Sequence, residues 1–435
     1  MIVEFSVKNF RSIKELQTIS FATTGLKSAE KHSEIDSNNI ATEGDMRLFK
    51  TLGIYGANAS GKSNIIKALD YFIATITREP SSESNMNLLA DPFLYQPSSQ
   101  ETESFFQIVL LVNGIKYRYG LTIKKNAISN GGMSYSQEII TNEWLYGRKH
   151  KKMVPLFQRD GMQLIKNTLV NKNVIPKDIP YEHTLFLTHS AAFDKRGECH
   201  AIRKYFTEAT TSNFKISHEK FRFLSMAYIS DESFYSHYNK EDFINFLSIF
   251  GLSYSDITIE QDESLTKYIT RPFPQAKVFL HKQYKDNKNK TVRVSLNLRD
   301  NESAGTQKLF DLAGLLRLIF RSNESSLIIL DEIDGNFHPS LLIKLIGLFN
   351  NPAINKSKSQ LLFTSHDTNL MSPAIMRRDQ FFFTEKNEDE STKLYSLADL
   401  KGIRNDADFA KQYLAGYYGA VPVLSNFMST TVEDE

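Results

Sequence analysis

The sequence predicts an α/β protein whose mixed sheet is antiparallel in its N-terminal part and parallel in its core, with an inserted, mainly helical lid. Val3, Phe5 and Val7 alternate with polar residues, which is typical of a half-buried strand. Residues 48–55 form a second predicted strand, which leads through a Gly-rich turn into an amphipathic helix. The unbroken apolar run at 327–330 is typical of a strand buried on both faces of a parallel sheet.

The turn after the second strand carries the clearest motif. Residues 56–63, Gly-Ala-Asn-Ala-Ser-Gly-Lys-Ser, match the pattern G-x-x-x-x-G-K-[ST] of a phosphate-binding P-loop, which predicts ATP and Mg²⁺ as cofactors. The glycines let backbone N–H groups face a phosphate, Lys62 adds a charge at the β- and γ-phosphates, and the Ser63 hydroxyl binds Mg²⁺. A chance turn before a helix is the alternative, but both flanks favour a P-loop. The predicted nucleotide-binding residues here are Gly56, Asn58, Ser60, Gly61, Lys62, Ser63 and Asn64.

A P-loop requires an acidic partner at the end of a hydrophobic strand, and residues 327–332 supply one. Asp331 is the predicted Mg²⁺ ligand, and Glu332 is the predicted base that orients and deprotonates the attacking water. Two acids after a strand are often only a solvated strand end, and it is the P-loop that favours the catalytic interpretation. Gln96 could also contact Mg²⁺ and the water, or it could be an ordinary turn residue before a proline.

Composition sets broad limits on the class of protein. A chain of 435 residues can hold two or three domains, and a formal net charge of +2 gives no global attraction to nucleic acid or membrane. Cys199 is the only cysteine, which excludes an internal disulfide and a multi-cysteine zinc site. Because no signal peptide or apolar run of membrane-spanning length is found, we expect a cytoplasmic protein without membrane contact.

Several further elements are predicted along the chain. Residues 104–112, 115–123 and 138–146 predict a β-meander, with Asn113-Gly114 as a hairpin turn. The stretch 182–250 has helical spacing, and we interpret it as a compact lid. Other predicted elements are a loop at 27–45, a link at 78–84, a solvated basic turn at 148–152 and a hairpin of strands 275–284 and 291–298. The predicted domains are residues 1–165 and 266–435, two parts of one head, and the lid at 166–265.

A second helix start lies shortly before the acidic strand. Residues 302–308, Glu-Ser-Ala-Gly-Thr-Gln-Lys, open a predicted helix with Ser303 as its N-cap. The free N–H groups beside Gly305 could receive a phosphate. By itself this is an ordinary N-cap.

The order of these motifs resembles the ABC-type ATPase heads of SMC, RecF and OLD proteins within the AAA ATPases. Residues 302–307 are similar to the signature motif of those heads, although they depart from its common Leu-Ser-Gly-Gly-Gln form. The resemblance implies that Ser303 and Gly305 contact the γ-phosphate bound to a second copy, so that ATP is enclosed in a dimer or a higher homo-oligomer. Residues 334–339 resemble the D-loop, and His366 resembles the switch histidine that bonds the γ-phosphate region.

Segments outside the motifs resemble the stand-alone ABC ATPases of bacterial anti-phage defence operons, the RloA/AbiL type. They are residues 5–12, 117–120, 377–386 and 416–422. OLD nucleases carry a Toprim metal site after the head, and the chain ends soon after Pro422. We therefore expect any nuclease chemistry to belong to a separately encoded effector.

These observations predict an ATPase that dimerises around ATP and regulates a partner effector in anti-phage defence. A DNA-binding repair or maintenance ATPase like RecF is the alternative, with DNA as the main ligand. A third interpretation is a nucleotide-gated scaffold with negligible turnover.

Overall fold

The computed structural model describes residues 1–422 except 80–83, 85, 131–132, 150–151, 209–211, 214–217, 230–238, 261–275 and 336. The predicted link at 78–84, basic turn at 148–152 and helical stretch at 182–250 therefore lie partly outside the described residues. Among the described helices, none is both long and apolar enough to cross a bilayer.

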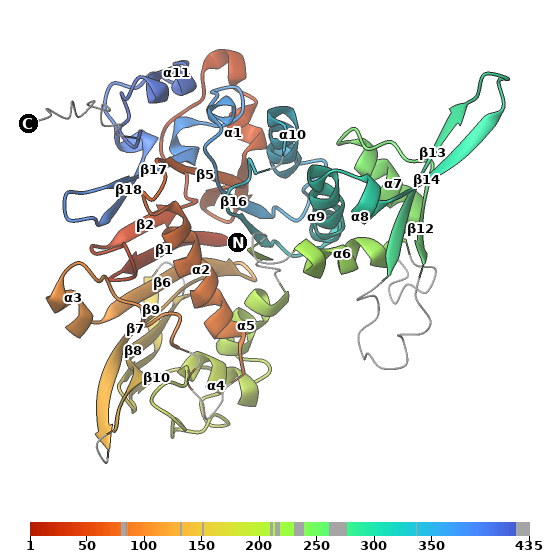
Figure 1. The fold of residues 1–435 in the computed structure, drawn as a ribbon. Coiled ribbons are helices and arrows are strands. Elements are labelled where there is room, and N and C mark those ends of the chain that lie inside the picture. Colours follow the sequence, from red (N-terminus) through yellow and green to blue (C-terminus); the bar gives the residue numbers. More distant parts are fainter. Residues whose placement is uncertain are drawn as a thin grey trace, which may run out of the picture.

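The first large element is a seven-stranded antiparallel sheet in the order β10-β9-β8-β7-β6-β1-β2 (Figure 1). It confirms the predicted first strand and meander, and the Asn113-Gly114 turn has φ values of 51° and 74°. The first strand was predicted to be buried on one face only. A bulge between Ile2 and Glu4 instead places Val3 in a separate small hydrophobic cluster with Leu48. The strands are β1 (Ile2–Lys8), β2 (Gln17–Ser20), β6 (Ser104–Val112), β7 (Ile115–Asn130), β8 (Met133–Lys149), β9 (Lys152–Asp160) and β10 (Gln163–Asn167).

The second large element is a six-stranded sheet in the order β11-β15-β16-β5-β17-β18. All neighbouring strands in it are parallel except the final pair, so the predicted combination of antiparallel and parallel sheets is confirmed. The carboxyl ends of β5, β15 and β16 share one edge, where ligands bind in open α/β sheets. The strands are β5 (Thr51–Gly56), β11 (Ser212–Asn213), β15 (Leu327–Leu330), β16 (Gln360–Thr364), β17 (Phe381–Lys386) and β18 (Thr392–Ser396).

Two predictions before the P-loop were wrong. The single strand expected at 48–55 is two strands, because β4 (Met46–Phe49) ends at Phe49, pairs with β3 (Ile40–Glu43), and is followed at Thr51 by β5. The expected loop at 27–45 contains β3 and two short helical turns, η1 (Glu30–His32) and α1 (Ile35–Asn38). Short elements of three or four residues carry too little periodicity to be found in a sequence.

The helices divide between two hydrophobic cores. The P-loop helix α2 (Lys62–Thr77) packs with α4 (Phe186–Phe193) and α5 (Glu198–Glu208) in the core of the antiparallel sheet. Helices α6 (His218–Ala227) and α7 (Lys240–Ser248) instead pack on α9 (Ala304–Arg321) in the core of the parallel sheet. The predicted lid helices thus occur, but they cover two different parts of the protein. The domain limits at 165 and 265 stay predictions.

Most of the remaining elements belong to the core of the parallel sheet. A three-stranded sheet of β12 (Asp256–Glu260), β13 (Lys277–Lys285) and β14 (Thr291–Asn297) contains the predicted hairpin, which projects from the body (Figure 1). The other helices are α3 (Pro97–Glu101), α8 (Leu298–Asn301), α10 (Pro339–Asn350) and α11 (Phe409–Leu414), and there are 3-10 turns η3 (Thr368–Leu370), η4 (Arg378–Gln380) and η5 (Leu397–Asp399).

A buried ion pair fastens the start of α4 to the antiparallel sheet. Glu143 on β8 and Arg159 on β9 have fully buried side chains 3.3 Å apart. The Glu143 carboxylate also accepts hydrogen bonds from the backbone N–H of Phe186 (2.7 Å) and of Leu187 (2.9 Å), and from the Tyr119 hydroxyl (2.9 Å). It therefore satisfies N–H groups that open a helix and have no partner within it.

Lys50, between β4 and β5, gives a test of the pH dependence of stability. Its side chain is buried, and Nζ donates to the carbonyl of Asn350 at the end of α10 (2.8 Å). Burial lowers the pKa of Lys50 to about 8, from 10.5 in the unfolded chain. Between these pH values the unfolded state binds more protons, so the free energy of unfolding rises with pH, by roughly 3 kcal/mol at most at about 1.4 kcal/mol per pKa unit.

We expect Lys50→Met to remove this rise. Urea unfolding of the native protein and of Lys50→Met at pH 8 and pH 10 measures the change in the free energy of unfolding with pH. Subtracting the change in the variant from the change in the native protein removes the contribution of other titrating groups. Equal pH slopes in the two proteins would show that Lys50 does not titrate in this range.

Candidate nucleotide-binding site

The P-loop backbone turns where the two glycines allow it. Gly56 has φ 150° and Gly61 φ 106°, both in the region that favours glycine. A Cβ added to Gly56 would lie 2.3 Å from the carbonyl oxygen of Thr384, and one on Gly61 would lie 2.0 Å from Thr392 Oγ1. The loop is therefore held tightly against β17 and β18, and the first residues of α2, Lys62 and Ser63, line the cleft.

Lys62 lies at the mouth of this loop. It is 6% exposed, and Nζ donates to the loop's own carbonyl oxygens at Gly56 (2.8 Å) and Ala57 (2.9 Å). Burial lowers its pKa, while the nearby carboxylates of Asp331, Asp334 and Glu332 oppose that change. A cation in this position can exchange carbonyl oxygens for phosphate oxygens without moving far.

The predicted Mg²⁺ ligands Ser63 and Asp331 meet across the sheet edge. Ser63 Oγ lies 3.3 Å from Asp331 Oδ1 and donates to it. Asp331 is 7% exposed and follows β15 directly, as the sequence predicts. Gln96 precedes α3 and does not line the cleft, although its neighbour Tyr95 does. A role for Gln96 at the metal stays a prediction.

Glu332 has an unusual backbone. Its φ is 52°, a conformation that costs energy for a residue other than glycine and is often found at functional sites. Its N–H donates to Thr364 Oγ1 (2.7 Å), and its carbonyl accepts from the N–H of Gly335 (3.0 Å). These bonds hold the Glu332 side chain at the cleft that the P-loop lines.

Thr364 was missed in the sequence, where it is one polar residue at the end of an apolar strand. Its hydroxyl is fully buried and donates to Asp331 Oδ1 (2.7 Å) while accepting from the N–H of Glu332. One hydroxyl thus fixes the predicted metal ligand and the predicted base relative to each other. The signal available was its position two residues before His366.

We expect Thr364→Val to lower the rate of ATP hydrolysis more than the affinity for ATP. A buried hydrogen bond of about 1–3 kcal/mol corresponds to a loss of roughly 5- to 150-fold in kcat. Thr364→Ser keeps the hydroxyl and is the matched control, with a kcat near that of the native protein. Equal kcat values for the Val and Ser variants would contradict a positioning role.

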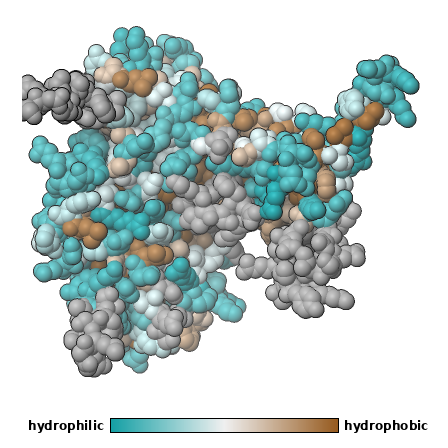
Figure 2. All heavy atoms as spheres, viewed as in Figure 1, coloured by the Kyte–Doolittle hydropathy of each residue, from teal (hydrophilic) through white to brown (hydrophobic). Residues whose placement is uncertain are grey.

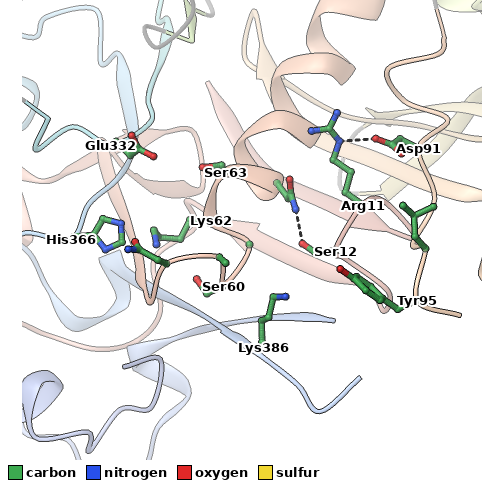
Figure 3. A pocket seen from close by; sticks show the side chains of 15 residues that line it. Arg11, Ser12, Ser60, Lys62, Ser63, Asp91, Tyr95, Glu332, His366 and Lys386 are labelled. Carbon is green, nitrogen blue, oxygen red and sulfur yellow. Dashed lines mark hydrogen bonds and ion pairs between the residues drawn. The ribbon is translucent and has the colours of Figure 1, made fainter. Parts of the chain in front are cut away.

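His366 lies at the same end of the cleft as Glu332 (Figure 3). Its backbone N–H donates to Asp334 Oδ2 (3.0 Å), which ties the switch-like histidine to the D-loop-like segment. Partial burial of the ring, together with the Lys62 charge, lowers the pKa of His366. The imidazole is therefore neutral at pH 7, with one N–H donor available for a phosphate oxygen.

The cleft has a volume of about 530 Å³ and extends past the P-loop to Arg11, Ser12, Asp91 and Tyr95, for which the sequence predicted no role in binding. In Figure 3, Tyr95 and Arg11 lie on the side of Lys62 away from His366. Arg11 Nε donates to Asp91 Oδ2 (2.8 Å), and Asn64 bonds Ser12 Oγ (2.7 Å).

The predicted loop residues differ in what their side chains can reach. Asn58, Ser60 and Asn64 all line the cleft. The Ser60 hydroxyl, however, is buried and bonded to Thr384 Oγ1 (2.6 Å), so only the backbone of Ser60 is available to a ligand.

Ser303 and Gly305 do not line this cleft. Ser303 Oγ accepts from the N–H of Thr306 (3.2 Å), which confirms the predicted N-cap of α9. Ser303 is exposed, and Lys308 Nζ donates to the carbonyl of Gly335 (2.9 Å). Within one chain, the signature-like segment is thus tied to the D-loop-like segment and not to the P-loop.

The residues present fit a nucleotide with Mg²⁺. The helix N-terminus and Lys62 supply positive potential for phosphates. A hydroxyl and a carboxylate 3.3 Å apart are hard oxygen ligands, and Mg²⁺ takes few protein ligands because it retains several waters. Among the described residues there is no group of three or more His, Cys, Asp or Glu that could hold a metal ion.

Comparison with known families decides the general class. Residues 52–160 and 170–372 match the family described as "AAA domain, putative AbiEii toxin, Type IV TA system". The chain belongs to this AAA family. The matched residues of the AAA domain include the P-loop from Gly56, the acids after β15 and His366. Membership supports ATP binding and an ATPase of the P-loop type, and Mg²⁺ is the usual companion of ATP in such domains.

Two similar solved structures align with most of the AAA protein, although their sequence identity to it is low. The SMC head domain from Thermotoga maritima has 13% identity and a TM-score of 0.38, covering 91% of this chain and 98% of its own. A structure of the recombination mediator protein RecF-ATPrS in the RecFOR pathway has 15% identity and a TM-score of 0.33, with the same coverage. No curated relative matches the chain.

Proposed function

We propose that the protein is an ABC-type ATPase that hydrolyses ATP with Mg²⁺ at the cleft between the P-loop and the end of β15. The observation that carries this proposal is the Ser63–Asp331 contact of 3.3 Å, because it joins the phosphate-binding loop to the acids. Lys62, Glu332 and His366 surround the same cleft. The two residues are 268 positions apart in the chain, and the shared edge of the parallel sheet brings them together.

Each side chain has one task in this proposal. Mg²⁺ bound to ATP would neutralise charge that develops on the phosphates. Lys62 binds phosphate oxygens, and Ser63 and Asp331 hold the metal. Glu332 orients a water molecule and accepts its proton. His366, neutral at pH 7, donates a hydrogen bond to the γ-phosphate region.

Nucleotide binding can be tested before turnover. Titration calorimetry with a non-hydrolysable ATP analogue should show binding that Mg²⁺ strengthens, and Lys62→Ala should abolish it. Ser63→Ala should show a smaller effect of Mg²⁺ on binding than the native protein, because it lacks the metal-binding hydroxyl and keeps only Asp331. Unchanged Mg²⁺ dependence in Ser63→Ala would contradict the assignment of the metal site.

We further propose that the site is completed by a second copy of the chain. Supporting this, Ser303 is exposed at the start of α9 and lies outside the cleft of its own chain. Light scattering on Glu332→Gln should detect dimers with ATP and monomers without it. Ser303→Arg should still bind ATP but remain monomeric, and an ATP-dependent dimer in that variant would argue against this interface.

Finally, we propose that this cytoplasmic ATPase controls a separately encoded effector, such as a nuclease, in anti-phage defence of the RloA/AbiL type. The family description, which names a toxin–antitoxin system, supports a defence role. Cells that carry the gene with its neighbours should plate phage poorly, and Lys62→Ala should restore plating. Equal protection by the variant would favour a role that does not need the nucleotide.

A further inference from the structure

The β13–β14 hairpin concentrates positive charge on a projecting arm (Figure 1). Residues 277–293 include six Lys or Arg and a single Asp, a local net charge of +5, whereas the whole chain has only +2. The rest of the protein is therefore net negative. Positive charge concentrated in this way attracts polyanions such as nucleic acids.

The lysines at the tip of the hairpin are exposed and can contact a ligand. Lys285, Lys288 and Lys290 are exposed, and none has an ion pair within the part of the chain that the structure describes. The one acid of the arm, Asp286, uses its carboxylate to accept the backbone N–H groups of Lys288 (2.9 Å) and Lys290 (2.8 Å). Asp286 thus stabilises the turn through backbone hydrogen bonds, and the ammonium groups of the three lysines remain exposed to solvent.

The shape of the arm indicates which polyanion fits. Alternate residues of β13 share one face, whose inner part, Val278 and Leu280, is buried in the core. The outer part of that face carries Tyr284, which is 54% exposed, opposite Val292. Figure 2 shows the hydrophilic tip and the apolar residues along the arm. A two-stranded ribbon fits the major groove of B-form DNA, about 12 Å wide, whereas the major groove of duplex RNA is too narrow.

We propose that this hairpin binds duplex DNA, with Lys285, Lys288 and Lys290 contacting phosphates on either side of the groove. The proposal does not depend on ATP hydrolysis, because no residue of β13 or β14 lines the nucleotide cleft.

The test is the salt dependence of DNA binding by the full-length protein. Fluorescence anisotropy with a labelled 20-base-pair duplex, at several salt concentrations, gives the slope of log K against log salt. Each phosphate contact contributes about 0.9 to that slope, so Lys285→Gln/Lys288→Gln/Lys290→Gln should reduce it by about 2.7. The matched control, Lys344→Gln/Lys356→Gln/Lys401→Gln, removes the same charge from exposed lysines elsewhere and should keep the native slope.

The same measurements distinguish binding at the hairpin from diffuse electrostatic attraction and from binding of a different partner. All replaced side chains are exposed, so both variants should fold, which circular dichroism checks. ATP hydrolysis without DNA should be unchanged in the hairpin variant. Binding that both triple variants weaken equally would overturn the proposal in favour of diffuse attraction. Absence of DNA binding at low salt, or equal affinity for duplex RNA, would overturn it in favour of an acidic protein partner or shape-independent binding.

Discussion

Replacement of Glu332 by glutamine is expected to lower the rate of ATP hydrolysis by about 10²- to 10⁴-fold, the usual contribution of a general base. The side chain lies at the cleft, on a backbone with φ 52° that the hydroxyl of Thr364 holds in place. Glutamine has nearly the same shape and can orient a water molecule, but it cannot accept the proton. Because Lys62, Ser63 and Asp331 are untouched, we expect ATP affinity to remain within a few-fold of native.

Phosphate release and nucleotide binding, measured on the same preparation, separate these two effects. Glu324→Gln is a matched control, since this exposed glutamate lies before the opposite end of the same strand, β15, and should leave the rate unchanged. A Glu332→Gln rate within about threefold of native would mean that another group takes the proton.

Glu143→Ala is expected to destabilise the protein by about 3–5 kcal/mol, as is found when one partner of a buried ion pair is removed. The variant would leave the Arg159 guanidinium without its carboxylate in a site where both side chains are fully buried. It would also leave the N–H groups of Phe186 and Leu187 without their acceptor. We therefore expect α4 to detach from the antiparallel sheet before the rest of the core unfolds.

Urea unfolding followed by the fluorescence of Trp144, the single tryptophan and the neighbour of Glu143, reports on this region directly. Glu182→Ala makes the same change at an exposed side chain and should cost less than about 0.5 kcal/mol. A loss below about 1 kcal/mol in Glu143→Ala would show that water replaces the carboxylate.

The parts of the site that the sequence predicts are those with local patterns. The P-loop lies between a strand and a helix, and Asp331 follows an apolar run, so the shared edge of the parallel sheet brings them together. Thr364 could not be found in this way, because its role depends on contacts to residues more than 30 positions away. Likewise, the bond between Ser12 and Asn64 depends on tertiary packing.

Elements of the fold, like residues of the site, were predictable from the sequence only where the pattern is local. The hairpin at Asn113-Gly114 was predictable because it is set by two adjacent residues. The division of 48–55 into two strands depends on long-range pairing, because β4 pairs with β3 whereas β5 pairs with β16 and β17. The lid helices were predictable as helices, but their division between two cores depends on which apolar faces, on α2 and on α9, they meet.

Steady-state ATP hydrolysis by the native protein and by Lys62→Ala tests the claim that this cleft hydrolyses ATP. We expect slow phosphate release that requires Mg²⁺, stops with EDTA, and is absent in Lys62→Ala. Phosphate release that is equal in the two proteins, or none by the native protein although it binds Mg·ATP, would contradict the claim and favour a nucleotide-gated scaffold.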